Sequence, residues 1–216
     1  GGLAGDAITT SSSNTAVGRS SLSATTTGDE NSAVGRGSLS ANTTGENNAA
    51  LGFNALASNT TADNNTGIGS SALASNTTGA SNIAIGSLTL DANTTGEFNT
   101  AIGKEAMTTN TTGDRNVAVG FKALKTMNVT DGSHTFNTAV GFAAGELTTT
   151  GTGNTFMGAN AGGVNTTGSD NVAIGKIALD ANTTGVRNTA VGTQSLSDNT
   201  TGDFNVAIGR DAMHNN

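Results

Sequence analysis

The chain has 216 residues, of which 31 are glycine, 34% are hydrophobic and 3% are aromatic, with no cysteine, proline, tryptophan or tyrosine. So few large side chains exclude a thick globular core, and the absence of cysteine excludes disulfides and thiolate metal sites. A net charge of −7, with nine basic residues spread along the chain, argues against nucleic acid as a partner. No apolar run approaches the length of a membrane span, so we predict no membrane insertion.

One motif repeats along the whole chain. Its first Asn recurs every 17 residues, except for one step of 21 residues between Asn116 and Asn137. Counted from that Asn as position 1, the idealised unit is Asn-Thr-Ala-Val/Ile-Gly-x-x-Ala-Leu-x-x-Asn-Thr-Thr-Gly-x-x, almost complete in residues 171–187. We therefore predict a single repeat array over residues 1–216, interpreted as a fragment of a longer chain.

Each unit is predicted to form one coil of strands and turns, because Gly, Asn and Thr are poor helix formers. Positions 1 to 5 suit a short strand whose fourth side chain points inward, and the stretch around Leu at position 9 suits a return strand. Asn-Thr-Thr-Gly suits the turn, with Asn bonding its own backbone and Gly at positive φ. The predicted core is the apolar column at position 4: Val17, Val34, Leu51, Ile68, Ile85, Ile102, Val119, Val140, Met157, Ile174, Val191 and Ile208.

The predicted fold is all-β, a β-solenoid or parallel β-roll of about twelve 17-residue coils, flattened to two strands per coil. Coils stacked about 4.8 Å apart make a rod on the order of 60 Å long. The small residues at positions 3 (Ala) and 5 (Gly) form regular columns, which we expect to let neighbouring chains pack closely in a homotrimer. The alternative is a monomeric solenoid whose Ala column faces water.

The one 21-residue unit predicts a loop insertion over residues 127–134. The hypothesis for this loop is receptor contact, and the alternative is a tolerated insertion with local packing repair. The candidate ligand-contact residues are Asn128, Thr130, Asp131, Ser133 and His134. More than half of the seven phenylalanines lie near the loop in sequence: Phe121, Phe136, Phe142 and Phe156.

Three further columns suggest surface chemistry. Asn-x-Thr sequons predict glycosylation sites in a glycosylating host, although most also fit as plain turn asparagines: Asn42, Asn59, Asn76, Asn93, Asn110, Asn128, Asn165, Asn182 and Asn199. Consecutive acids at position 16 suggest either cation binding or a solvated turn: Asp29, Glu46 and Asp63. Stacked threonine pairs, such as Thr43-Thr44 and Thr60-Thr61, suggest an ice-binding array, of which one file faces outward.

Enzymatic motifs are missing from the sequence. Neither Gly-x-x-x-x-Gly-Lys-Ser/Thr nor Gly-x-Gly-x-x-Gly occurs, although phosphate-binding loops need them. The two histidines, His134 and His214, lie far apart on a predicted rod, where they cannot share a site. We therefore predict no catalytic residue, no metal site and no cofactor.

The pentapeptides at residues 14–18, 82–86 and 171–175 carry a resemblance to a known family. Asn-Thr-Ala-Val-Gly, Asn-Ile-Ala-Ile-Gly and Asn-Val-Ala-Ile-Gly resemble the head repeat of trimeric autotransporter adhesins. This resemblance implies left-handed parallel β-rolls assembled as intertwined homotrimers. The longer pattern with Asn-Thr-Thr-Gly is similar to repeats of phage tail-fibre proteins and large bacterial surface proteins.

These observations predict an extracellular structural rod and adhesion module, located on a bacterial cell surface or a phage virion. Its expected partners are further copies of itself and a host-surface protein or glycan. Two alternative functions are an ice-binding solenoid that uses stacked threonines and a self-assembling extracellular filament subunit.

Overall fold

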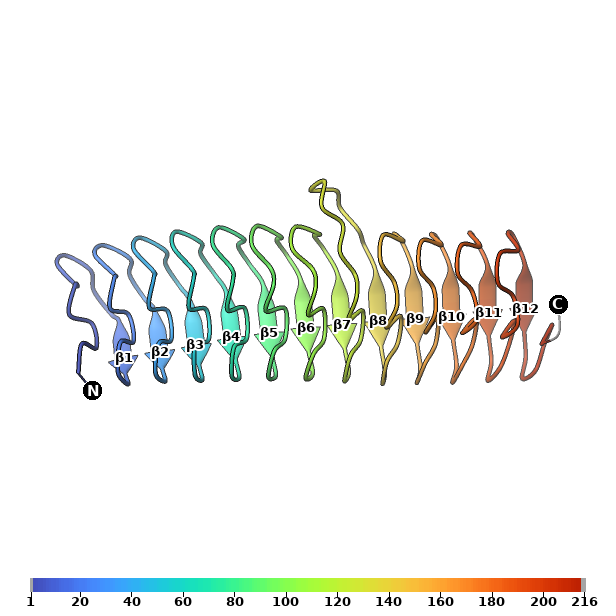
Figure 1. The fold of residues 1–216 in the computed structure, drawn as a ribbon, viewed down its shortest axis with the longest axis horizontal. Helices are drawn as coiled ribbons and strands as arrows, with labels where there is room; N and C mark the ends of the chain where they lie inside the picture. The colour runs from blue at the N-terminus through green and yellow to red at the C-terminus, as the bar shows by residue number, and fades with distance from the viewer. Residues whose placement is uncertain (1, 215–216) are drawn as a thin grey trace.

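Twelve three-residue strands follow one another at the spacing of the repeat in a computed structural model, which describes residues 2–214 (Figure 1). The ends of the predicted array, residue 1 and residues 215–216, lie outside the described part. The strands are β1 (Thr15–Val17), β2 (Ser32–Val34), β3 (Ala49–Leu51), β4 (Thr66–Ile68), β5 (Ile83–Ile85), β6 (Thr100–Ile102), β7 (Val117–Val119), β8 (Thr138–Val140), β9 (Thr155–Met157), β10 (Val172–Ile174), β11 (Thr189–Val191) and β12 (Val206–Ile208).

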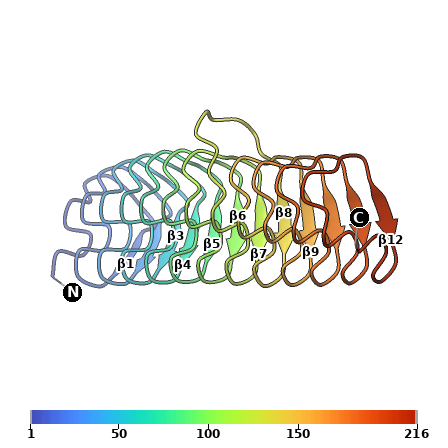
Figure 2. The ribbon, with the colours of Figure 1, turned by 45° about the vertical axis from the view of Figure 1, so that its right-hand side comes forward.

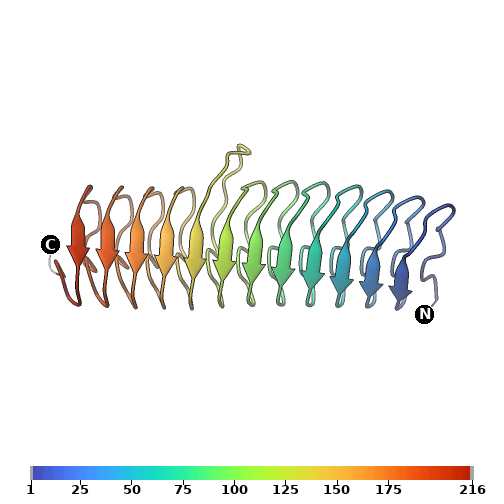
Figure 3. The same cartoon turned by 180° about the vertical axis from the view of Figure 1, so that it is seen from behind.

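All twelve strands form one parallel sheet in chain order, and equivalent repeat positions lie side by side. Thr15 pairs with Ser32, and the same register holds across the insertion, where Val117 pairs with Thr138. The coils therefore stack along one axis, with the blue first coils and the red last coils at opposite ends (Figures 2 and 3). The predicted all-β solenoid with 17-residue coils is confirmed.

Two ladders of buried asparagines run through the interior. In the position 1 column, Asn99 donates from Nδ2 to the Gly113 carbonyl at 2.9 Å, and its Oδ1 accepts the backbone N–H of Asn116 at 3.1 Å. In the position 12 column, Asn93 Nδ2 donates to the Gly96 carbonyl at 3.0 Å, which confirms the predicted bond from the turn asparagine to its own backbone. Because each amide uses groups of adjacent coils, the ladders hold the coils in register.

The prediction that position 4 forms the core is wrong. Position 3 points inward and is buried in every coil from β2 to β12, whereas position 4 points outward. The position 4 residues are half-buried or exposed, and eight of them are exposed by 36% to 71%: Val17, Val34, Leu51, Ile102, Val140, Met157, Ile174 and Ile208. The other four, Ile68, Ile85, Val119 and Val191, are half-buried.

Strand alternation explains this reversal. Successive strand side chains point to opposite faces, so the inward Asn at position 1 places position 3 inward and positions 2 and 4 outward. Leu at position 9, buried in residues such as Leu56 and Leu124, fills the interior from the opposite wall. Only a small residue at position 3 leaves room for that leucine.

The predicted return strand around position 9 is also wrong. Within residues 2–214, each coil contributes one strand, and the opposite wall is a succession of turns. Positions 7 and 9 have left-handed backbone, with φ of 58° at Lys122 and 48° at Leu124. A β-strand cannot include residues in that region, so the wall opposite the sheet is irregular.

The small columns have a role inside the chain and not the predicted one between chains. The Ala column at position 3 faces the interior, and the Gly column at position 5 lies where successive coils touch. Gly18 has a φ of 125°, and a Cβ there would lie 2.7 Å from the Gly35 carbonyl oxygen. The glycine of Asn-Thr-Thr-Gly does not have the predicted positive φ. It is required because the next coil is too close for a side chain: a Cβ on Gly96 would lie 2.7 Å from the Gly113 carbonyl oxygen.

One large residue in the position 3 column shows how tightly the interior is filled. Phe156 replaces the usual Ala and is fully buried. Its ring occupies the space of two missing leucine side chains, because position 9 is Gly145 in the preceding coil and Gly162 in its own. A Cβ on Gly145 would lie 2.7 Å from the Phe156 ring and 2.9 Å from Leu124.

We expect Phe156→Ala alone to lose about 3–5 kcal/mol of stability, because it leaves a cavity. Restoring the leucines alone, with Gly145→Leu and Gly162→Leu, destabilises through clashes with the ring. The triple variant matches the other coils and regains most of the loss. Urea unfolding of the wild type and the single, double and triple variants measures this coupling. Additive changes in stability would contradict the idea that the Phe156 ring fills the space of the two missing leucines.

A second departure from the repeat places a carboxylate where other coils have a hydroxyl. At position 10, Ser40 donates from Oγ to the Ala57 carbonyl of the next coil at 3.2 Å. Asp91 occupies the equivalent place, and its Oδ1 is buried without a hydrogen-bond partner. Burial is the main reason that the pKa of Asp91 is raised above 3.8.

Asp91→Ser is expected to raise the thermal midpoint more at pH 7 than at pH 4. A raised folded-state pKa means that the destabilisation caused by Asp91 is absent below pH 3.8 and grows as this side chain ionises at higher pH. The control is Asp198→Ser, which removes an exposed carboxylate at a position that is serine in Ser58 and Ser75. Equal gains for both variants at both pH values would contradict the burial argument.

Candidate functional site

The 21-residue unit forms the predicted protruding loop between β7 and β8, which leaves the outline of the rod in Figures 1 and 3. Its base is anchored in the coil, because Met127 and Val129 are buried. Asn128 Oδ1 accepts the Thr111 hydroxyl at 2.8 Å, and the Val129 carbonyl accepts the Thr112 hydroxyl at 2.6 Å. The base of the loop therefore continues the stacking of the preceding coil.

The tip of the loop is exposed and polar. Thr130, Asp131 and Ser133 all face solvent. The backbone N–H of Ser133 donates to Asp131 Oδ1 at 2.9 Å, and its hydroxyl donates to the same oxygen. These hydrogen bonds lower the pKa of Asp131. The tip thus presents the Asp131 carboxylate in a fixed turn, with the exposed Thr130 beside it.

His134 lies on the returning side of the loop, against the preceding coil. Its Nδ1 lies 3.1 Å from Asp114 Oδ2, and its Nε2 lies 2.8 Å from an Arg115 guanidinium nitrogen. Its ring meets the edge of Phe136, with centroids 5.7 Å apart. The five predicted contact residues are therefore divided: Thr130, Asp131 and Ser133 form the tip, while Asn128 and His134 join the loop to the coil.

The four phenylalanines near the loop in sequence do not form one aromatic surface. Phe136 is 57% exposed and packs on His134. Phe121 and Phe142 stack on each other with centroids 5.4 Å apart, at position 6 of successive coils. Phe156 is in the core. Of these four phenylalanines, Phe136 alone is exposed next to the loop and could contribute to a contact site there.

The predicted glycosylation ladder is wrong for eight of its nine sequons. The amides of Asn42, Asn59, Asn76, Asn93, Asn110, Asn165, Asn182 and Asn199 are buried in the position 12 ladder. Asn93 Nδ2, for example, donates to Asn76 Oδ1 at 2.8 Å, so a glycan on that nitrogen is incompatible with the fold. The ninth, Asn128, is half-buried at the base of the loop.

The acidic column at position 16 has a role in stacking. Asp63 Oδ1 accepts the backbone N–H of Glu46 at 2.8 Å, and Asp114 Oδ1 accepts that of Glu97 at 2.7 Å. Each of these two aspartates therefore satisfies a backbone N–H of the preceding coil. Among residues 2–214, no three His, Cys, Asp or Glu side chains gather in a way that would hold a metal ion.

The threonine columns present one exposed file. The first threonine of each pair donates to the next coil, as Thr43 does to the Thr60 carbonyl at 3.0 Å and Thr60 to the Thr77 carbonyl at 3.1 Å. The second threonine, such as Thr44, is exposed. The structure thus agrees with a single outward row of threonines, and the Asn-Thr-Thr-Gly turns form no broad array of hydroxyl groups.

The sheet presents a uniform surface, the strand face, which we define as the outward side chains of the first and third residues of β1 to β12. Its third-residue row is entirely aliphatic or Met, and its first-residue row consists of Thr, Ser, Ala, Val and Ile. Neither row contains a charged residue, although 12% of the chain is charged. The strand face is therefore an uncharged stripe along the whole rod.

Comparisons with known proteins add no likeness, since no family model, no curated protein and no solved structure matches the chain. In the part of the chain that the structure describes, no helix is long and apolar enough to cross a membrane.

Proposed function

We propose that this chain is a structural rod and adhesion module of an extracellular fibre, on a bacterial cell surface or a phage virion, and that it acts by surface contact without catalysis. The observation that carries the proposal is the uninterrupted in-register stack from β1 to β12, which gives a stiff spacer. The exposed tip at Thr130, Asp131 and Ser133 is the feature best placed to meet a host-surface protein or glycan. The resemblance of the pentapeptides to trimeric adhesin heads supports the same function.

The partner along the shaft is proposed to be further copies of the same chain, in a homotrimer. The strand face supports this, because an aliphatic row exposed along a whole rod is expected to be covered. Only another repeat with the same spacing can match it over its full length. Left-handed winding and an intertwined arrangement are proposed from the resemblance alone.

The size of the strand face is compatible with such an assembly. Twelve strands about 4.8 Å apart make it roughly 50 Å long, and three residues per strand make it roughly 10 Å wide. The resulting area of about 500 Å² is shared between two neighbours in a trimer, so each contact must also include the flanking corners to reach the roughly 800 Å² per partner of a stable interface.

We expect the purified chain to sediment as a trimer at micromolar concentration, and the variant Val34→Lys, Ile102→Lys, Ile174→Lys to sediment as a monomer. In the trimer, the three new lysines of each chain would be buried in the interface, and the cost of removing their charges from water exceeds the gain from the apolar contact. Lysines at the exposed turn residues Thr44, Thr78 and Thr167 add the same charge and serve as the control. A monomeric wild-type chain, or a strand-face variant that stays trimeric, would contradict the proposed homotrimer.

Adhesion is tested with beads that carry the chain, applied to cultured epithelial cells and to a glycan array. We expect binding above that of bare beads and a several-fold loss when Met127–His134 is replaced by Asn-Thr-Thr-Gly. The replacement removes the tip and restores a 17-residue unit, so circular dichroism should not change. Wild-type beads that bind neither surface would contradict adhesion, and equal binding by both proteins would exclude the loop alone.

A further inference from the structure

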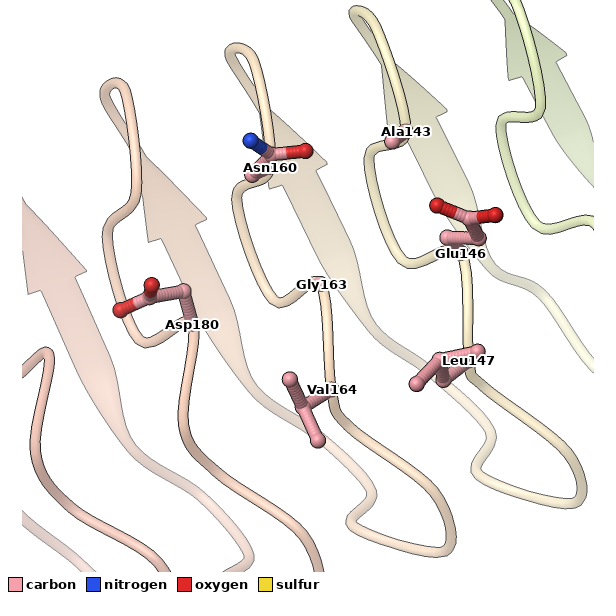
Figure 4. Close-up of a pocket in the computed structure, with 7 residues that line it drawn as sticks. All are labelled: Ala143, Glu146, Leu147, Asn160, Gly163, Val164 and Asp180. Carbon is pink, nitrogen blue, oxygen red and sulfur yellow. The ribbon is translucent and has the colours of Figure 1, made fainter.

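A surface pocket of about 330 Å³ lies on the turn side of the rod, in front of the strands (Figure 4). Three successive coils line it, through repeat positions 7, 10 and 11. The lining residues are Ala143, Glu146, Leu147, Asn160, Gly163, Val164 and Asp180.

The pocket occurs where the outward residues depart from the repeat. Position 11 is small in eight other coils: Ala24, Ala41, Ser58, Ser75, Ala92, Thr109, Thr126 and Ala181. In the two pocket coils it is Leu147 and Val164, which are 42% and 40% exposed. Between them, position 10 is Gly163, which has no side chain and leaves the floor open.

Core packing does not account for these outward changes. The ring of Phe156 explains the inward glycines Gly145 and Gly162, because it fills their space. The atom nearest to a Cβ on Gly163 would be the Asn160 carbonyl oxygen at 3.2 Å and not the ring, and the φ of Gly163 lies outside the left-handed region. Ala57 and Ala74 occupy the equivalent position in other coils, so the backbone there accepts a side chain.

The polar groups of the pocket are mainly hydrogen-bond acceptors. Glu146 and Asp180 lie two coils apart, with Gly163 and Val164 on the coil between them and Leu147 next to Glu146 on its own coil (Figure 4). Glu146 shares its charge with Lys122, whose Nζ lies 3.7 Å from Oε1. Asp180 forms no ion pair with another group of residues 2–214, and burial raises its pKa. A carboxylate in this position favours a cation that arrives with its own apolar surface.

We propose that this pocket binds the side chain of a Lys or Arg residue presented by a protein partner, with the methylene stem on Leu147 and Val164 and the cationic head between Asp180 and Glu146. The inference rests on the proposed adhesive function, to which it adds a contact site and the chemistry of its ligand. A neutral sugar fits less well, because no aromatic ring lines the pocket to stack on a sugar ring and a sugar brings no charge to meet the two carboxylates.

The position of the pocket is compatible with the proposed trimer. Its lining belongs to turn segments on the wall opposite the sheet, whereas the strand face is on the outer side of the sheet (Figure 4). Chains that associate through their strand faces would keep the pocket on the outside of the fibre, where a partner protein can reach it.

The test is an NMR titration of the folded chain with the tripeptides acetyl-Gly-Lys-Gly-amide and acetyl-Gly-Arg-Gly-amide. The neutral peptide acetyl-Gly-Gln-Gly-amide and glucose are the comparison probes. We expect shifts confined to residues 143–147, 160–164 and 180, with a Kd on the order of 1 mM for a single side chain. Glucose that binds there at least as tightly would transfer the site to a glycan and overturn the proposal.

Two variants separate the charge from the apolar stem. Asp180→Asn keeps the shape of the side chain and should weaken binding of the basic peptides at least fivefold. The double variant Leu147→Ala, Val164→Ala restores the residue found in Ala24 and Ala41, so it should fold normally and weaken binding to a similar degree. The matched control, Leu88→Ser, removes an exposed leucine elsewhere at a position that is Ser20 and Ser71 in other coils.

The outcomes distinguish this site from the general function. Basic peptides that cause no shifts at the pocket, or that bind both pocket variants as tightly as wild type, would overturn the site while adhesion through the loop could still be measured on beads. Peptide binding at the pocket combined with no bead adhesion would contradict the proposed function and leave the site in place.

Discussion

The structure depends on buried asparagine side chains whose hydrogen bonds reach into the adjacent coils. Asn99 uses both ends of its amide, toward the Gly113 carbonyl and the Asn116 N–H. A slip of one residue would bury such amides without partners, at a cost of about 1–3 kcal/mol for each group. The interior is thin and poor in large side chains, so hydrogen bonds carry an unusual share of the specificity. This constraint explains why the register survives the insertion between β7 and β8.

The narrow interior also limits side-chain volume: a larger residue on the strand wall requires a smaller one on the opposite turn wall. Leu at position 9 and Ala at position 3 share a fixed space, and Phe156 is accommodated only beside Gly145 and Gly162. A change on one wall therefore requires a compensating change on the other, which keeps interior positions nearly identical along the array. Outward positions are under no such constraint, so their composition reflects what lies outside each chain.

The period, the strand position, the parallel stacking and the place of the loop could all be predicted from the sequence, because a 17-residue repeat leaves few ways to bury equivalent residues. The inward face could not be assigned from hydrophobicity, since alternation allows either Ala at position 3 or Val and Ile at position 4 to point inward. The residue that decides between them is the buried Asn at position 1, because it lies two residues before position 3 and so points to the same side of the strand. At the loop, sequence located the exposed tip but not the contacts of Asn128 and His134 with the preceding coil, which depend on stacking.

The two sides of the rod differ in a way that bears on how a repeat protein acquires function. The strand face repeats the same uncharged pair of residue types over twelve strands, and this periodicity is what supports the proposed association with further copies of the chain. The turn side carries the charges, the loop and the local departures at Leu147, Gly163 and Val164. A ligand that meets such a departure contacts only two or three coils and needs no periodicity of its own. Because the asparagine ladders hold every coil in the same register, one coil can change its outer residues without disturbing the strand face on the opposite wall.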